Sequence, residues 1–384
     1  MSKIYDVIII GAGSIGVPAA MNLAKAGLQV LCLEELPSPG QKNNKKAIGG
    51  VRASHSDFGK IKLCQRSIEI LSNWKEKYGE DIGWHQGGYS YVAYTKEDEK
   101  FLKDLMQVQI SYGLNIKWLS PEEYQELVPG INMEGLRGAT FTPEDGNCSP
   151  LLTINAIYFK SLDFGAEYRF NEKVEDFVVV DGHITEVKTD KGSYSAKQFI
   201  NASGNNARNL SALLGLNCRV IPDCHEGGIT EPVKRFFEPM VVDMRPDVGS
   251  KNYYFYQNHE GQVVFCITPD PPILGTDSDA TSEFLPMCSR RMVKLFPKLK
   301  NLKIRRQWRG QYPMTPDGFP IIGRLKEYPN LIQAAGMCGQ GFMLGPGLGE
   351  LLTRIVLNTL STDDLHILES FDPYRSFFGM EQFT

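Results

Sequence analysis

Three glycines near the N-terminus have the spacing of a phosphate-binding turn. Residues 3–10, KIYDVIII, are rich in β-branched side chains and predict a buried parallel strand. Gly11, Gly13 and Gly16 follow as G-x-G-x-x-G, and VPAAMNLAKAG then predicts a helix that ends at Gly27. The N-terminus of a helix reached through such a turn presents free backbone N–H groups and a positive dipole to an anion.

An acidic residue completes this unit. LQVLCLE predicts a second strand that ends on Glu34. A carboxylate at that place accepts hydrogen bonds from a ribose diol and repels the 2′-phosphate of NADP. Strand, glycine turn, helix and acidic strand end together predict a dinucleotide-binding βαβ unit. The unit alone does not separate FAD from NAD.

Composition and charge narrow the class of protein. The chain has 384 residues, of which 42% are hydrophobic and 22% charged, as in ordinary globular proteins of two domains. A formal net charge of -4 argues against a nucleic-acid-binding surface. No apolar run is long enough for a membrane span, and the predicted first strand leaves no room for a signal peptide. We therefore expect a cytoplasmic protein.

Cysteine and histidine patterns give no support for a metal site. The eight cysteines include no CxxC pair, and the six histidines form neither HxxxH nor HExxH. In a chain of this length without a secretion signal, isolated buried thiols are the expected state.

The remaining elements are predicted from periodicity and capping residues. Residues 58–79 are expected to form one amphipathic helix, and Thr95, Ser120 and Ser149 each to cap a helix, Ser120 through a capping box with Glu123. From Cys218 to Arg309, β-patterned segments and one helix predict an antiparallel sheet inserted into the nucleotide-binding domain.

A second glycine-rich segment lies near the C-terminus. LIQAAGMCGQGFMLGPGLGELLTRIVLN predicts a strand, a loop and a helix, with glycines at 336, 339, 341, 345, 347 and 349. These glycines are expected to leave backbone N–H groups exposed at a helix N-terminus, which suits a second anionic ligand edge.

Taken together, these segments resemble the D-amino-acid-oxidase-like family of FAD-dependent amine oxidoreductases. The motifs that carry the resemblance are GAGSIG with Glu34, GGVR, NASG, WRGQYPMTPDGFPIIG, AAGMCGQGFMLGPGLGE and FDPYR. They cover nearly the whole chain in order. The likeness is greatest to the β subunits of dye-linked L-proline dehydrogenase and heteromeric sarcosine oxidase, and to D-hydroxyproline dehydrogenases. It implies FAD rather than NAD.

The resemblance also implies the fold. We expect an α/β plus α+β protein, with a Rossmann-like FAD-binding domain of the GR2/DAO type and an inserted antiparallel-sheet substrate domain. Residues 1–88, 145–217 and 313–384 are expected to form the discontinuous FAD-binding domain. Residues 89–144 and 218–312 are expected to form the substrate-binding domain.

Residues for the cofactor follow from the family motifs. Those expected near the pyrophosphate are Gly11, Ala12, Gly13, Ile15, Gly16, Ala202 and Gly204. Glu34 is expected at the adenosine ribose, Val174 at the adenine and Arg52 beside the isoalloxazine. The C-terminal loop is expected to contribute Gly336 and, along the isoalloxazine, Gly339, Gly341, Phe342 and Met343.

Three departures from the family pattern refine these expectations. Monomeric sarcosine oxidases attach FAD through a cysteine a few residues before the TPD segment, where this chain reads RGQYPMTPD, so FAD is expected to bind non-covalently. The family's Gly-His-Gly-Phe is here Gly-Gln340-Gly-Phe, which places Gln340 among the candidates for holding the flavin edge or substrate. No lysine matches the one that promotes oxygen reduction in sarcosine oxidases.

The implied reaction removes a hydride from the carbon beside an amine nitrogen to flavin N5 and gives an imine. Leading substrates are small secondary amines or amino acids that resemble proline, hydroxyproline, sarcosine or D-amino acids. Arg309, Arg52 and His55 are candidates for binding a substrate carboxylate, although Arg309 in a structural ion pair is an equal alternative. Tyr254 and Tyr256 share one face of a predicted strand and are candidates for the pocket wall, with a core role as the alternative.

Two other functions stay open. One is an FAD dehydrogenase of a hydroxy compound. The other is an FAD-carrying electron-transfer subunit of a heteromeric dehydrogenase, which would need a partner subunit or a separate electron acceptor.

Overall fold

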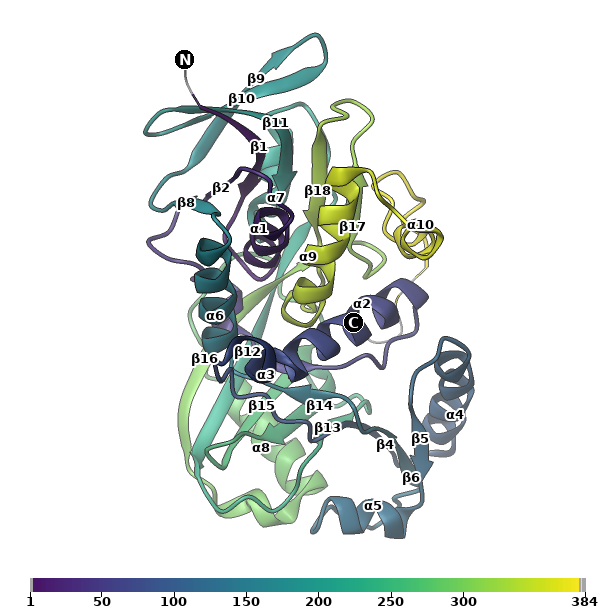
Figure 1. Cartoon of the computed structure of the whole chain (residues 1–384). Coiled ribbons are helices and arrows are strands. Elements are labelled where there is room, and N and C mark those ends of the chain that lie inside the picture. The colour runs from purple at the N-terminus through teal and green to yellow at the C-terminus, as the bar shows by residue number, and fades with distance from the viewer. Residues whose placement is uncertain (1–2, 380, 382–384) are drawn as a thin grey trace.

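Two eight-stranded sheets dominate the computed structural model, which describes residues 3–379 and 381. Figure 1 shows the first sheet in the upper half of the view, with α1 (Gly16–Lys25) and α9 (Gly341–Leu357), and the second in the lower half, with α8 (Phe284–Leu295). A two-stranded ribbon of β3 (Gly50–Val51) and β7 (Gly146–Asn147) is separate from both.

The first sheet has a parallel centre that begins with the N-terminal strand. Its strands are β1 (Ile4–Ile10), β2 (Val30–Leu33), β8 (Glu167–Arg169), β9 (Val174–Val180), β10 (His183–Thr189), β11 (Ser193–Asn201), β17 (Ile321–Arg324) and β18 (Leu331–Ala335). The strands β8, β2, β1, β11 and β18 pair in parallel in that order, whereas β17 and the β9–β10 hairpin pair antiparallel. Residues Val7, Ile8 and Ile9 are fully buried because layers cover both faces of β1.

These layers come from different parts of the chain. On one face, Val7 and Ile9 share a core with α1, α2 (Phe58–Ser72), α6 (Pro150–Asp163) and α9. On the other face, Ile8 and Ile10 pack with the β9–β10 hairpin and with Leu210 of α7 (Ala207–Ala212).

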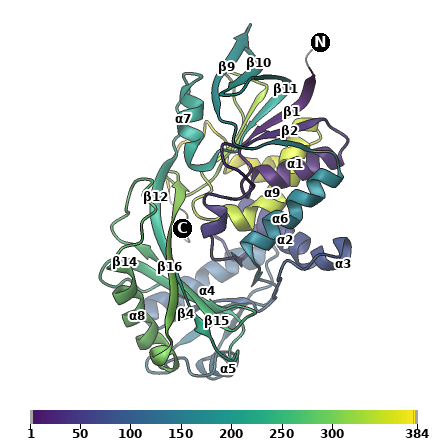
Figure 2. The same cartoon turned by 90° about the vertical axis from the view of Figure 1, so that its left-hand side faces the viewer.

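The second sheet joins an early and a late segment of the chain. Its order is β16 (Ile304–Met314), β12 (Ile221–Pro232), β15 (Gln262–Pro269), β14 (Ser250–Gln257), β13 (Met240–Asp243), β4 (Tyr89–Ala93), β6 (Gly138–Thr142) and β5 (Lys117–Leu119). All neighbours pair antiparallel except β13 and β4. Figure 2 shows the long strands β12 and β16 side by side. Both ranges predicted for the substrate domain supply strands to this sheet, and the domain boundaries stay a prediction.

Helix starts follow the predicted capping residues. Thr95 caps α4 (Lys96–Ser111) and Ser120 caps α5 (Pro121–Leu127), each through a capping box, and Ser149 caps α6. The single helix predicted over 58–79 is wrong, because it breaks at Asn73 into α2 and α3 (Trp74–Tyr78). The amide of Asn73 donates to the carbonyl of Glu69 at 2.8 Å and ends the first helix. The remaining elements are α10 (Thr362–Glu369) and the 3₁₀ turns η1 (Asn44–Lys46), η2 (Gly204–Asn206) and η3 (Pro297–Asn301).

Helices α1 and α9 touch through glycines. A Cβ on Gly345 would lie 2.0 Å from the carbonyl oxygen of Ser14, and one on Gly349 would lie 2.7 Å from that of Pro18. Gly347 meets the carbonyl oxygen of Leu63 in α2 in the same way, at 2.4 Å. These three glycines therefore allow close helix packing, rather than forming the anionic ligand edge expected from the sequence.

Candidate active site

The glycine turn after β1 forms one end of the candidate site. Gly11 has φ 105°, and a Cβ there would lie 2.6 Å from the carbonyl oxygen of Ala202. A Cβ on Gly16 would lie 1.8 Å from the carbonyl oxygen of Gly11, so this glycine closes the turn beneath the helix. Gly13, by contrast, faces open space, with no described atom within 4 Å of a Cβ built on it. A ligand can therefore approach the backbone at Gly13.

Helix α1 and Glu34 provide the groups able to bind a ligand at this end of the site. Among the described residues, no side chain caps α1 and no acid lies in its first turn, so its positive end is available to an anion. Glu34 directly follows β2, and its carboxylate accepts the N–H of Ala12 at 2.8 Å and that of Leu36 at 3.0 Å. Burial raises the pKa of Glu34 above its ordinary value, and these two hydrogen bonds partly oppose that rise.

A cavity of about 470 Å³ extends from this turn to the second sheet. Most of the residues predicted from the sequence lie on its wall. They are Gly11, Ala12, Gly13, Ile15, Glu34, Arg52, Val174, Ala202, Gly204, Tyr254, Gly339, Gln340, Gly341, Phe342 and Met343. The fold thus brings the N-terminal turn, the GGVR segment, the second sheet and the C-terminal glycine loop around one space.

Two predicted glycines lie behind the wall. Gly16 packs against Gly11 as described above. Gly336 has φ 69°, and a Cβ there would lie 2.4 Å from the side chain of Thr315. Both glycines permit the backbone path of a loop that lines the cavity, but they do not face it.

His55 and Tyr256 also lie outside the wall. His55 is fully buried, with Nδ1 3.1 Å from Arg52 and Nε2 3.5 Å from the thiol of Cys64. Burial, together with the charges of Arg52 and Lys60, lowers the pKa of His55 well below its ordinary value, so the ring is neutral and unsuited to binding a carboxylate. The hydroxyl of Tyr256 donates to the carbonyl of Ile48, and its ring packs in the core on this face of the second sheet.

Arg309 does not line the cavity and instead binds the loop that contains Asp277 and Asp279. Its guanidinium lies 2.9 Å from Asp277 and 3.1 Å from the carbonyl oxygen of Asp279, in the segment that follows β15. The neighbouring Gln311 donates to the carbonyl of Asp277 at 2.7 Å. The structure therefore places Arg309 in the ion pair that the sequence left as the alternative.

Arg52 is a buried cation on the cavity wall. It is 6% exposed, and its guanidinium donates to the carbonyl of Ser54. The rings of Tyr89 and Tyr91 in β4 each have their centroid 5.8 Å from the guanidinium carbon. This aromatic setting holds a charge that is able to form a bidentate contact with a carboxylate.

Sequence reasoning missed much of the wall formed by the second sheet. Its members there include Tyr89, Tyr91, Val242, Met244, Lys251, Asn252, Cys266, Thr268 and Tyr312. Asn252 and Tyr254, like Cys266 and Thr268, are two residues apart on one strand, so alternation carried a signal. The alternation did not predict which face of each strand lines the cavity.

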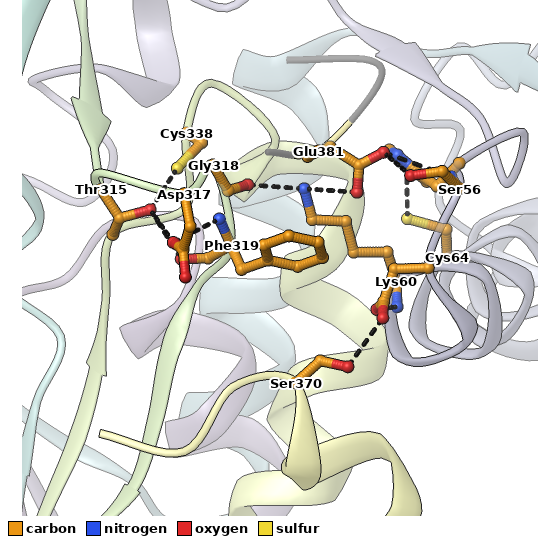
Figure 3. A network of polar contacts seen from close by, with 12 residues as sticks. Ser56, Lys60, Cys64, Thr315, Asp317, Gly318, Phe319, Cys338, Ser370 and Glu381 are labelled. Carbon is orange, nitrogen blue, oxygen red and sulfur yellow. Dashed lines mark hydrogen bonds and ion pairs between the residues drawn. The ribbon is translucent and has the colours of Figure 1, made fainter. Parts of the chain in front are cut away.

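Lys60 and Glu381 form a buried ion pair, and the charge of Glu381 also acts on Arg52. Lys60 is fully buried, and Figure 3 shows its side chain extended between the carbonyl of Gly318 and the carboxylate of Glu381. Its Nζ lies 2.8 Å from the former and 3.3 Å from the latter. The backbone N–H of Ser56 donates to Glu381 at 3.2 Å. Glu381 also lines the cavity, so a residue near the end of the chain belongs to its wall.

The residues present fit a dinucleotide. A side chain at position 13 would fill the open space beside Gly13. The N-terminus of α1, which has no capping side chain among the described residues, is able to bind a pyrophosphate, and the carboxylate of Glu34 is able to accept hydrogen bonds from a ribose. Helix α9 likewise begins with no capping side chain among the described residues and with Gly341 and Phe342 on the cavity wall. Its positive end suits the part of a flavin that gains negative charge.

The described part of the chain has neither a metal-binding cluster nor a disulfide bond. Residues 3–379 and 381 contain no cluster of three or more His, Cys, Asp or Glu side chains that would hold a metal ion. The eight cysteines are free and buried. None of the described helices has the length and apolar character needed to cross a bilayer.

Comparison with known proteins decides the family. The family model described as FAD dependent oxidoreductase (DAO) matches residues 6–355. The chain belongs to this family. The resemblance read from the sequence motifs is confirmed, and with it the predicted fold class and the dependence on FAD.

Curated relatives of this DAO-family chain differ in length. It is 26% identical to glycine oxidase of Bacillus licheniformis over 387 residues, which cover 94% of this chain and 96% of the relative. It is also 26% identical to mitochondrial dimethylglycine dehydrogenase of Mus musculus over 391 residues, 96% of this chain. The chain spans only 44% of the length of that relative.

Solved structures match along the whole chain. L-proline dehydrogenase from P. horikoshii superposes with a TM-score of 0.90 at 30% identity, and the match covers 98% of each chain. Glycine oxidase from Geobacillus kaustophilus gives a TM-score of 0.86 at 24% identity, over 97% of this chain and 99% of the other, which supports the fold alone.

Proposed function

We propose that this chain oxidises the C–N bond of a small amino acid or secondary amine, with FAD as cofactor. The observation that carries the proposal is Arg52, a buried cation on the wall of the same cavity that begins at the dinucleotide-binding turn. The relatives are named for glycine, dimethylglycine and L-proline, compounds that share a carboxylate and an amine on the same carbon. A single buried guanidinium suits such a carboxylate.

Each part of the wall has a role in this proposal. The turn at Gly11 and Gly13 and the start of α1 would hold the pyrophosphate, Glu34 the ribose, and the Gly339–Met343 loop the isoalloxazine. FAD, when bound, supplies the acceptor for the hydride. Arg52 binds the substrate carboxylate and so fixes which C–H bond faces that acceptor, while Tyr254 and Tyr312 exclude water from the reacting carbon.

Non-covalent attachment is part of the proposal. Two cysteines lie on the cavity wall, Cys266 and Cys338. Burial raises the pKa of Cys266 to about 12 and that of Cys338 above its ordinary value, so neither is a thiolate nucleophile at neutral pH. The place of the attached cysteine in monomeric sarcosine oxidases falls in RGQYPMTPD, where β16 has Gly310 and no cysteine.

An anaerobic titration of the purified holoenzyme tests the proposal. The oxidised-flavin absorption band is followed while D- and L-proline, hydroxyproline isomers, sarcosine, glycine, other D-amino acids, 2-hydroxy acids and glycerol 3-phosphate are added in turn. Bleaching by amines alone is expected. Bleaching only by hydroxy compounds would favour the hydroxy-compound alternative. A flavin that dithionite reduces but no compound does would favour an electron-transfer subunit.

Three related predictions stay open. Re-oxidation in air of the substrate-reduced protein separates an oxidase from a dehydrogenase. Co-purification from the native source tests the predicted partner subunit or electron acceptor. Localisation of the tagged full-length protein tests the predicted cytoplasmic compartment.

A further inference from the structure

A lysine of the second sheet lies where the cavity meets solvent. Lys251 of β14 lines the cavity and is exposed. Its ammonium group makes no ion pair or hydrogen bond with any residue that the structure describes. An exposed residue on a cavity wall marks a place where the cavity opens to solvent. The positive charge of Lys251 is therefore available to a ligand at this end of the cavity.

A β-bulge changes the direction of the strand at Lys251. The register pairs Ser250 with Pro269 of β15. It then pairs Asn252 with Thr268, so two steps along β14 match one step along β15, and Lys251 is the extra residue. Neighbouring residues of a regular strand point to opposite faces, whereas a bulge redirects a side chain. The bulge explains why Lys251 and Asn252, which are adjacent in the sequence, both line the cavity.

The groups beside Lys251 are neutral hydrogen-bonding groups rather than acids. The side-chain carbonyl of Asn252 accepts the N–H of Thr268 at 3.0 Å, which leaves its NH₂ group as a donor without a partner among the described residues. The hydroxyl of Thr268 also has no hydrogen bond in the described part of the chain. Glu226, the one carboxylate that the described strands of this sheet contribute to the wall, accepts the amide of Gln307 at 2.6 Å. This part of the wall therefore suits a carboxylate.

Arg52 and Lys251 are set apart across the second sheet. Arg52 lies beside the ring of Tyr91 in β4. Tyr91 is in register with Val242, which is in register with Tyr254, and Lys251 lies three residues before Tyr254. With strands about 4.8 Å apart and about 3.3 Å per residue, the backbones of Tyr91 and Lys251 are roughly 14 Å apart, a gap that the two long cationic side chains shorten. A ligand with two carboxylates separated by several bonds is able to contact both cations.

We propose that Lys251 binds a second carboxylate of the substrate, which makes an amine with two acidic groups the preferred substrate class. This inference rests on the proposed function, in which Arg52 binds the first carboxylate. The amine nitrogen and the carbon that loses the hydride lie between the two carboxylates, so contacts at both ends fix their position. Asn252 and Thr268 complete the second site by donating hydrogen bonds to the same carboxylate.

Binding of unreactive ethers tests the second site without turnover. Methoxyacetate has one carboxylate, whereas 4-(carboxymethoxy)butanoate has a second one at the end of a flexible chain. Each is titrated into the oxidised holoenzyme, and the shift of the flavin absorption band gives the dissociation constant. The diacid should bind about 10-fold more tightly than methoxyacetate. In 4-(carboxymethoxy)butanamide an amide replaces the second carboxylate, and most of this advantage should be lost.

Variants at position 251 test whether the lysine is the source of this advantage. The ratio of the two dissociation constants should fall to about one in Lys251→Met, stay near its original value in Lys251→Arg and reverse in Lys251→Glu. Lys188→Met, at an exposed position of β10 outside the cavity wall, is the matched control and should keep the original ratio. High salt should reduce the ratio in the unmodified protein, because dissolved ions screen an exposed pair of charges.

A diacid that binds no more tightly than methoxyacetate, or an advantage that Lys251→Met keeps, would overturn the role of Lys251 and leave the proposed function standing. Anaerobic reduction of the flavin by sarcosine and by N-(3-carboxypropyl)glycine tests the proposed function separately. Reduction at lower concentrations of the diacid than of sarcosine is expected. A response to sarcosine alone would contradict the role of Lys251, and a flavin that neither these two nor any other amine reduces would overturn the proposed function itself.

Discussion

At the scale of single residues, charge is placed where burial makes it expensive. Arg52 is 6% exposed and Lys60 is fully buried, and each has its charge matched by oxygen atoms or aromatic rings. Unpaired charges in such positions would be strongly destabilising. For Arg52, the free-energy cost of burying the charge would be offset further by contact with a substrate carboxylate in the cavity.

Glu34 is the residue whose role in cofactor binding is easiest to isolate. Glu34→Gln removes the negative charge while keeping the shape of the side chain, so one charge-assisted hydrogen bond to the ribose is lost. We expect FAD to bind about 10- to 100-fold more weakly, which corresponds to roughly 1.5–3 kcal/mol. Titration of the apoprotein with FAD, followed by flavin fluorescence, measures this. Glu175→Gln, at an exposed position of β9, should bind FAD normally. Equal affinity in all three proteins would contradict the assignment of Glu34.

Asp145 predicts a pH dependence of stability. Its carboxylate accepts the N–H of Ala53 at 3.0 Å and the hydroxyl of Thr142, yet burial raises the pKa of Asp145 to about 7. Between about pH 4 and pH 7 the folded protein therefore holds a proton that the unfolded chain has lost, and the free energy of unfolding falls as the pH rises, by roughly 4 kcal/mol in total.

Asp145→Asn should lack this loss of stability. Melting temperatures of the variant and the unmodified protein, measured from pH 4.5 to pH 8, should diverge in favour of the variant up to about pH 7 and then stay parallel. A difference that does not vary with pH would contradict the assigned ionisation.

At the scale of elements, the contact between α1 and α9 joins the two glycine-rich segments. Gly345 lies against the carbonyl of Ser14, which belongs to the turn that opens α1. A side chain on α9 at this point would separate the two helices and move the turn.

Gly345→Ala tests this contact. We expect a loss of about 1–3 kcal/mol in the free energy of unfolding, because the new methyl group would meet backbone rather than a movable side chain. FAD affinity should fall as well, since the turn moves with the helix. Gly192→Ala is the control, because no described atom lies within 4 Å of the added Cβ. Unchanged stability and affinity in Gly345→Ala would show that the helices separate freely.

At the scale of the whole molecule, the cavity belongs to both sheets. The first sheet provides the turn at Gly13 and the second provides Tyr254 and Tyr312. Ligand binding should therefore stabilise elements that are far apart in the sequence. Hydrogen exchange should slow in both the 11–16 turn and β14 when FAD is added to the apoprotein. Slower hydrogen exchange in the first sheet alone would show that FAD does not contact the second sheet.

The sequence predicted the local parts of this arrangement better than the distant ones. Gly11, Gly13 and Glu34 were found because strand, turn and helix follow one another within a short stretch. Arg309 was a candidate for the cavity, but its ion pair with Asp277 joins β16 to a loop that is distant in the sequence, so the contact exists only in the folded chain. Tyr312 lies on the cavity wall because β16 pairs with β12 in one register, which no local pattern reveals.

The most direct test of the central claim compares an amine with its oxygen counterpart. Sarcosine and glycolate share a carboxylate, and the neighbouring carbon carries a methylamino group in the first and a hydroxyl group in the second. Proline and tetrahydro-2-furoate differ only in the ring atom, which is nitrogen in one and oxygen in the other. Each is mixed anaerobically with the oxidised holoenzyme, and the flavin absorption band is followed. Bleaching by the nitrogen compound of at least one pair, and by neither oxygen compound, is the predicted result. Bleaching by glycolate with no response to either amine would contradict the account.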